Sequence, residues 1–217
     1  MPARSAAAAI TIAAAAVATA AGPAAAATLV LDQPCYLERA TVIAGGQGWD
    51  PSKTVEIKDS AGSRFFQSAT TNPMGAFLTN FRAPLLPTIK PAVQSFVAAA
   101  SEIGNAALTA QAPFMVTNAR VDADLTGKPT QRVPFSISGF APRKIVYGHW
   151  VYKRRVRATV AMGKVPAPCG VVTRKVRRIP ARLHSGTWTI QFDTRRRYSA
   201  RTSPRQVLKL TLLHTFH

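Results

Sequence analysis

Short runs of alternating apolar and polar residues recur along most of this 217-residue chain. A period of two is typical of a strand with one buried face. Gly, Pro and Asn residues separate the runs and indicate turns. The runs occupy residues 55–58, 77–81, 135–138, 188–192 and 207–212. Many short strands at this spacing predict an all-β fold, either a sandwich or a barrel.

One segment, from Val93 to Ala107, has a different pattern. Its apolar residues Phe96, Ala100 and Ile103 fall on one face of a helix, so the periodicity favours a helix there. The segment is also rich in Ala, and an irregular crossing with one helical turn fits it equally well. Both interpretations stay open from the sequence.

Two stretches of the chain carry the same motif, in the order Gly, aromatic, any residue, Pro, any residue, Lys, any residue, aliphatic. They are residues 48–55 and residues 139–146. A second match follows in the same order: Gly75-x-Phe77-x-x-x-Phe81 resembles Gly186-x-Trp188-x-x-x-Phe192. A repeat of this period predicts two copies of one module of about 90 to 100 residues.

On these motifs, Gly48-Trp49-x-Pro51 and Gly139-Phe140-x-Pro142 above all, the module resembles the immunoglobulin-like domains of exported bacterial proteins. The resemblance covers nearly all of the chain after residue 27 and concerns the fold type. It implies two tandem Ig-like β-sandwich domains, residues 28–118 and 119–217, with Greek-key connections and no particular activity.

The first 27 residues have the organisation of a secretory signal peptide. Arg4 precedes an apolar stretch at residues 6–21, and the small residues Ala24 to Ala27 provide a cleavage site. An uncleaved membrane anchor is the alternative, although the stretch is shorter than the roughly 20 residues that span a bilayer. We expect cleavage after Ala27, no transmembrane segment in the mature chain, and a secreted or cell-surface location.

Charge divides the chain sharply. The formal net charge is +19, but residues 28–118 contain six Lys and Arg against six Asp and Glu. Residues 119–217 contain 21 Lys and Arg against three acids, Asp122, Asp124 and Asp193. An Arg-rich genome would affect both halves alike, so this asymmetry points to an anionic partner for the second module.

The basic residues of the second module are clustered. We expect residues 150–162 and 170–179 to form two strands of one long hairpin that carries two of the clusters. We also expect the Asp193 side chain to cap a turn. The predicted anion-binding residues are Lys153, Arg154, Arg155, Arg157, Arg174, Lys175, Arg177, Arg178, Arg195, Arg196 and Arg197. A solvated surface that keeps the protein soluble is the alternative interpretation.

Arginine binds phosphate and carboxylate groups through paired hydrogen bonds. Tyr147, Trp150, Tyr152 and Tyr198 are either core residues or stacking surfaces beside these arginines. Because the predicted signal peptide directs the protein out of the cytoplasm, the expected partner is an anionic cell-envelope polymer or an acidic surface protein rather than nucleic acid.

Motifs for enzymatic chemistry are absent from the sequence. The histidines do not fall at metal-ligand spacing, and His-Glu-x-x-His, Cys-x-x-Cys, Gly-x-Ser-x-Gly and phosphate-loop motifs do not occur. We therefore predict no catalytic residues, no metal and no cofactor. The function expected is a non-enzymatic binding or adhesion module, and the alternative is a structural subunit of a surface assembly.

The two cysteines, Cys35 and Cys169, belong to different predicted modules. Export favours their oxidation. If they pair, they join the two modules. If they lie far apart, they stay reduced or form a bond between chains. The sequence leaves these outcomes open.

Overall fold

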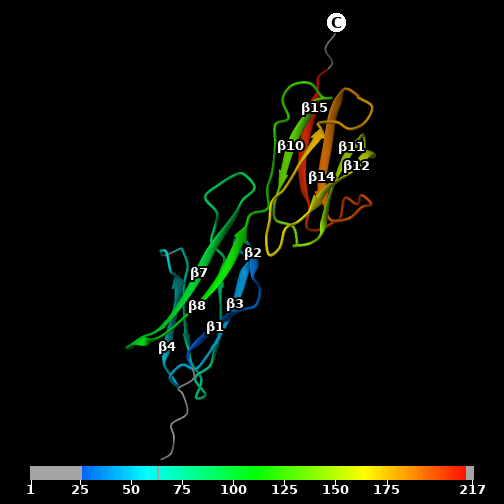
Figure 1. Ribbon diagram of the computed structural model, residues 1–217. Helices are drawn as coiled ribbons and strands as arrows, with labels where there is room; N and C mark the ends of the chain where they lie inside the picture. Colours follow the sequence, from blue (N-terminus) through cyan, green and yellow to red (C-terminus); the bar gives the residue numbers. More distant parts are fainter. Residues whose placement is uncertain (1–25, 63, 214–217) are drawn as a thin grey trace, which may run out of the picture.

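A computed structural model describes residues 26–62 and 64–213 (Figure 1). Strands, turns and loops account for all of these residues. Across these two ranges no helix has the length and apolar character needed to cross a membrane. The predicted signal peptide, residues 1–27, lies outside the described residues except for its last two. Residues 26–118 are called the N-terminal half below, and residues 119–213 the C-terminal half.

The N-terminal half contains two sheets. One has the strand order β1-β3-β6 and the other β2-β8-β7-β4-β5. Strand β2 runs parallel to β8, and the other pairings in these two sheets are antiparallel. The strands are β1 (Thr28–Leu31), β2 (Cys35–Leu37), β3 (Thr41–Gln47), β4 (Thr54–Asp59), β5 (Phe66–Thr70), β6 (Phe77–Arg82), β7 (Val93–Glu102) and β8 (Asn105–Thr117).

The C-terminal half also contains two sheets, and both are antiparallel. Their strand orders are β13-β10-β9 and β12-β11-β14-β15. The strands are β9 (Val121–Ala123), β10 (Arg132–Ile137), β11 (Ile145–Tyr152), β12 (Arg155–Lys164), β13 (Val172–Arg177), β14 (Gly186–Asp193) and β15 (Gln206–Leu212).

The two halves connect their strands in the same order. The chain passes from the middle of a three-stranded sheet (β3, β10) into the larger sheet (β4 and β5, β11 and β12). It then returns to the three-stranded sheet (β6, β13) and ends with two neighbouring strands of the larger sheet (β7 and β8, β14 and β15). The N-terminal half adds the short strand β2. Two copies of one topology therefore lie end to end (Figure 1).

Each half has its own hydrophobic core. One cluster of buried side chains draws on residues between Leu29 and Val116, and the other on residues between Val133 and Leu210. The predicted alternation is visible in β14, where Trp188, Ile190 and Phe192 are buried. A sandwich requires two sheets that each bury one face. The prediction of an all-β fold is confirmed for the described residues.

The Gly-aromatic-x-Pro motif has the same conformation in both halves, which confirms it as a repeat. Gly48 and Gly139 have φ angles of 77° and 86°, a region that favours glycine. The fourth residue after each, Ser52 and Arg143, also has a positive φ. The aromatic residue of each motif is buried. The motif is therefore the bend that carries the chain from one sheet to the other.

The second motif match is wrong as an alignment of the two copies. The segment beginning at Gly75 leads into β6, which pairs with β3 in a three-stranded sheet. The segment beginning at Gly186 is β14, which lies between β11 and β15 in the larger sheet. By strand order β6 corresponds to β13. The similarity arises because both segments are amphipathic strands with a positive-φ glycine at or just before the start of the strand.

Residues 93–107 form β7 and the start of β8, so neither a helix nor an irregular crossing occurs there. Phe96, Ala98, Ala100 and Glu102 are buried and the residues between them are more exposed, a period of two. Ladders to β4 and β8 satisfy both backbone edges of β7. This pairing outweighs the weak helical preference of an Ala-rich segment, because propensity is a small term beside tertiary packing.

The long hairpin predicted for residues 150–162 and 170–179 is also wrong. Strand β12 pairs with β11, whereas β13 pairs with β10 in the opposite sheet. The apolar residues Val172 and Val176 of β13 pack into the core from that sheet. Residues 165–171 therefore carry the chain from one sheet to the other, and the two basic strands avoid direct pairing.

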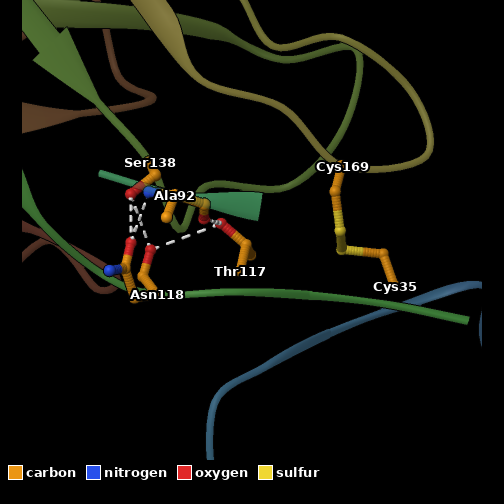
Figure 2. Close-up of a disulfide and its surroundings, with 6 residues drawn as sticks. All are labelled: Cys35, Ala92, Thr117, Asn118, Ser138 and Cys169. Atoms are coloured by element: carbon orange, nitrogen blue, oxygen red, sulfur yellow. Dashed lines mark hydrogen bonds between the residues drawn. A yellow bond between two sulfur atoms is a disulfide. The ribbon is translucent and has the colours of Figure 1, made fainter. Parts of the chain in front are cut away.

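Cys35 and Cys169 form a disulfide between the two halves (Figure 2). Their Cα atoms are 5.8 Å apart, within the usual range for a disulfide. Cys35 begins β2, and Cys169 lies in the loop between β12 and β13. The disulfide thus spans the point where the two sandwich-like halves meet.

Buried hydrogen bonds support the same junction. The Ser138 hydroxyl donates to the backbone carbonyl and to the side-chain Oδ1 of Asn118, both at 2.8 Å (Figure 2). Oδ1 of Asn118 also accepts from the Ala92 amide at 2.9 Å. An ion pair of 3.3 Å joins Arg120 of the C-terminal half to Glu38 of the N-terminal half. Covalent, polar and ionic contacts therefore hold the two halves together.

Candidate functional site

The structure places the predicted anion-binding residues on three separate elements of the C-terminal half. They are the β11–β12 turn with β12, the edge strand β13, and the loop between β14 and β15. Ten of these residues are exposed, and Arg178 is buried. The three elements do not form the single hairpin predicted from the sequence, but they all belong to one sandwich-like half.

The first cluster surrounds the turn between β11 and β12. Lys153 and Arg154 have φ angles of 48° and 62°, so two consecutive residues with positive φ make a tight hairpin turn. The Lys153 ammonium and the Arg157 guanidinium lie 5.6 and 6.0 Å from the centre of the Tyr152 ring. At these distances the ring attracts both cations weakly.

The second cluster lies on β13, the edge strand of its sheet. Arg177 stands directly opposite Arg132 of β10, and Lys175 stands opposite Pro134. All of these residues are exposed. Like charges opposite each other destabilise a sheet. No carboxylate in the described ranges lies within ion-pair distance of these three cations. Arg132 was absent from the prediction because only strand pairing brings it beside Arg177.

Arg174 occupies an inward-facing position of β13, between the buried residues Val172 and Val176. Its guanidinium reaches across the edge of the sandwich and donates to the backbone carbonyl of Ala161 in β12. A charged residue that points inward on an edge strand protects that edge from pairing with another chain. The contact also brings β12 and β13 together, so two basic strands share one edge.

Arg178 is not an anion-binding residue, which corrects the prediction. It is only 2% exposed. Its guanidinium donates to the carbonyls of Asp124 and Lys128 at 2.9 and 2.8 Å and to the Gln131 side chain at 3.1 Å. Burial of a charge requires such partners. Arg178 fastens the segment that connects β9 to β10, and an external anion cannot reach it.

Asp124 completes this contact at the surface. Its carboxylate lies 3.5 Å from the Arg178 guanidinium and accepts hydrogen bonds from the side chain and backbone of Thr126. The Thr126 hydrogen bonds, with a smaller contribution from Arg178, hold the pKa of the Asp124 carboxyl below its usual value. One of only three acids in the C-terminal half is thus engaged internally.

The third cluster follows β14. Arg195, Arg196 and Arg197 are all exposed. The Asp193 carboxylate accepts a hydrogen bond from the Arg195 amide at 2.7 Å, so the prediction that Asp193 caps a turn is confirmed. Asp193 is itself fully buried, so its side chain lies inside the fold, 3.4 Å from Nε2 of His149.

The aromatic residues of this half are mainly structural. Trp150 and Tyr152 are buried, and Tyr147 and Tyr198 are half-buried. The Trp150 indole donates to the Arg178 carbonyl at 2.6 Å. Tyr152 packs against Trp188 with ring centres 5.1 Å apart. For Trp150 and Tyr152 the core interpretation is correct, and neither ring can act as a platform for a ligand.

Within the described residues, no group of three or more His, Cys, Asp or Glu side chains could hold a metal ion. His149 is fully buried and bonds within the fold, and His184 stacks on Tyr152 with ring centres 5.1 Å apart. Among the charged side chains of the described C-terminal half, exposed guanidinium and ammonium groups are the most numerous.

No protein-family model matches the chain, and no curated protein matches its sequence. Similar solved structures include a tetra-tandem repeat in the extending region of a large adhesion protein, with 18% identity, a TM-score of 0.29, and coverage of 86% of this chain and 49% of that chain. This chain thus spans about half of that repeat structure.

Two further solved structures are similar. The CupB2 chaperone of Pseudomonas aeruginosa has 10% identity, a TM-score of 0.28, and coverage of 84% of this chain and 100% of that chain. The transglutaminase of red sea bream has 13% identity, a TM-score of 0.32, and coverage of 86% and 31%. At TM-scores this low, these likenesses assign neither a fold family nor a function.

Proposed function

We propose that this chain is an exported, non-enzymatic binding or adhesion module whose basic C-terminal half contacts an anionic polymer of the cell envelope. One observation carries the proposal: ten of the eleven clustered cations predicted to bind anions are exposed. Of the three acids in the same half, Asp193 is buried, whereas Asp122 and Asp124 are exposed and Asp124 is bonded to Thr126 and Arg178. Exposed cations therefore far outnumber exposed carboxylates on this surface.

The electrostatic cost of this arrangement supports a binding role. Arg132 and Arg177 face each other across two strands, and Lys175 is two residues from Arg177. Repulsion among such groups lowers stability unless counterions or a ligand compensate. An anionic polymer would relieve the repulsion at several positions at once. The release of its counterions would add a driving force that depends on salt.

The proposal includes two tandem Ig-like sandwich domains. Its support is the shared strand order of the two halves, with a three-stranded sheet facing a larger one in each. That arrangement fits the sandwiches common in surface proteins. Export is inferred from the signal-peptide pattern of residues 1–27 and fits a disulfide, because disulfides persist mainly outside the cytoplasm.

A structural subunit of a surface assembly is the second candidate, and the junction favours it. The Cys35–Cys169 disulfide and the Asn118–Ser138 hydrogen bonds hold the two halves end to end, as a stiff spacer requires. In that case the basic residues of the C-terminal half would contact an acidic neighbouring subunit. The two candidates differ in how salt affects them.

Retention of the mature protein on immobilised wall polymer, heparin and DNA across a salt series tests the proposal. We expect the logarithm of the binding constant to fall linearly with the logarithm of the salt concentration. The triple variant Arg154→Gln, Arg155→Gln, Arg177→Gln should make this slope shallower, by about 1 for each phosphate group that the protein no longer neutralises.

The matched control replaces three exposed cations of the N-terminal half: Lys53→Gln, Lys58→Gln and Lys90→Gln. This control removes the same charge and should keep nearly all of the retention. If the wild-type protein passes all three columns at low salt, the polyanion proposal is wrong. Retention that is insensitive to salt would instead favour assembly through apolar contacts.

A further inference from the structure

The two halves differ most at one equivalent connection. In the N-terminal half, β7 and β8 are joined by two residues, Ile103 and Gly104. In the C-terminal half, β14 and β15 are joined by the twelve residues 194–205, which include five arginines. Loops at the ends of sandwiches carry binding residues in many proteins. The longer loop is therefore an addition to a common framework, and its composition is strongly basic.

Buried polar side chains hold the start of this loop in one conformation. His149 is fully buried, and its Nε2 lies 3.0 Å from the Arg195 carbonyl. A carbonyl only accepts hydrogen bonds, so Nε2 carries a hydrogen and donates it, and Nδ1 forms a hydrogen bond of 3.0 Å with the Thr159 hydroxyl. The His149 ring thus joins β11 to both β12 and the loop.

Two neighbours of His149 complete this support. The Gln191 side-chain amide donates to the Asp193 carboxylate at 2.6 Å and to the Ser199 carbonyl at 2.8 Å. The Asp193 carboxylate accepts from the Arg195 amide. His149, Gln191 and Asp193 are all buried, and buried polar groups that satisfy one another fix a unique geometry. The loop is therefore preorganised before any ligand arrives.

The loop borders a polar hollow of about 440 Å³, which is lined by Tyr147, Thr159, Ala161 and Arg196. The Arg174 guanidinium bonds the carbonyl of the same Ala161, from the neighbouring edge strand. The Tyr147 hydroxyl and the Arg196 guanidinium suit an oxyanion, because both donate hydrogen bonds and the guanidinium adds charge. Among the described carboxylates, none lies within ion-pair distance of Arg195, Arg196 or Arg197.

We propose that the 194–205 loop is the principal anion-binding element of the protein. Arg195, Arg196 and Arg197 take the oxyanion groups of a linear polymer, and the hollow beside Arg196 receives one of these groups. The proposal rests on the proposed function and adds the location of the site. Phosphate and carboxylate polymers share this chemistry, since the guanidinium fork pairs with both.

The test uses two triple variants of the mature protein that remove equal charge. The loop variant is Arg195→Gln, Arg196→Gln, Arg197→Gln. The matched control is Lys128→Gln, Arg182→Gln, Lys209→Gln, three exposed cations of the same half that are outside the predicted anion-binding set. All six side chains are exposed, so both variants should fold, and thermal unfolding checks that they do. The immobilised probes are inorganic polyphosphate and polygalacturonate, which distinguish phosphate from carboxylate.

We expect the loop variant to lose roughly 100-fold in affinity for the preferred probe at low salt, while the control loses less than about fivefold. Equal losses in the two variants would overturn the location of the site and leave the proposed function intact. If the wild-type protein binds neither probe at low salt, the proposed function fails, and this proposal fails with it.

Discussion

The two halves of this protein share a strand order and differ in net charge and in the length of one connection. The N-terminal half has balanced charge and a two-residue connection between β7 and β8. The C-terminal half has 18 more cations than acids over residues 119–217 and a twelve-residue basic loop at the equivalent position. One framework therefore supports two different surfaces.

The comparison shows which positions the fold constrains. Trp49 and Phe140 occupy the same place in the repeated bend, and both are buried. Ser52 and Arg143 occupy a second pair of equivalent positions in the bend. There the backbone has a positive φ and the side chain is exposed. The inward positions keep an apolar character, whereas an outward position can change from Ser to Arg without altering the bend.

The largest expected effect tests whether the two halves behave as one unit. Removal of the disulfide by Cys35→Ala with Cys169→Ala opens a link across 134 residues of sequence. Because the disulfide restricts the conformational entropy of the unfolded chain, its removal should lower the unfolding free energy by up to about 5 kcal/mol. Urea unfolding of the variant and the wild type, under non-reducing conditions, measures the loss.

Wild-type protein treated with a reductant should unfold at the same urea concentration as the double variant, which serves as the control. If the double variant unfolds at the same urea concentration as the oxidised wild type, the disulfide does not couple the two halves, and each half unfolds independently.

A smaller effect separates structural from surface arginines within the C-terminal half. Arg178→Ala leaves the carbonyls of Asp124 and Lys128 without their buried donor, and should cost about 3 kcal/mol of unfolding free energy. Its neighbour provides the control: Arg177→Ala removes an exposed side chain and should change stability by less than about 0.5 kcal/mol. Urea unfolding followed by tryptophan fluorescence measures both. Equal, small losses would contradict the structural role of Arg178.

The smallest effect concerns the acid that accompanies Arg178. The pKa of Asp124 is lowered in the folded state by the Thr126 hydrogen bonds and by Arg178. A carboxyl with a lowered pKa contributes stability above its unfolded pKa, and loses that contribution as the pH falls through the folded value. Asp124→Asn should therefore lower the melting temperature slightly at neutral pH, and should have no effect well below the folded pKa. A difference that grows on acidification would contradict this assignment.

The sequence alone was sufficient for the class of fold and for the repeat. Alternating apolar residues in β4, β6, β10, β14 and β15 predicted strands, because a strand with one buried face imposes a period of two on its own residues. The Gly-aromatic-x-Pro bend was also visible, since its positive φ and its buried ring depend on adjacent residues. The asymmetry of charge between the halves required only counting.

Other features depend on which strands become neighbours, and adjacent residues do not encode that choice. The pairing of β12 with β11 and of β13 with β10 replaced the predicted hairpin, because the chain crosses between sheets at residues 165–171. The Ala-rich segment at residues 93–107 became strand only through its partners β4 and β8.

The individual roles of the charged and sulfur-containing residues were decided in the same way. Arg177 and Arg178 are adjacent in sequence, yet one faces solvent and the other is buried among carbonyls. Cys35 and Cys169 meet only because the two halves are placed end to end. The sequence by itself determined the strand pattern, the repeated Gly-aromatic-x-Pro bend and the distribution of charge along the chain. The tertiary structure decided which charges face solvent, because burial depends on contacts between residues far apart in the chain.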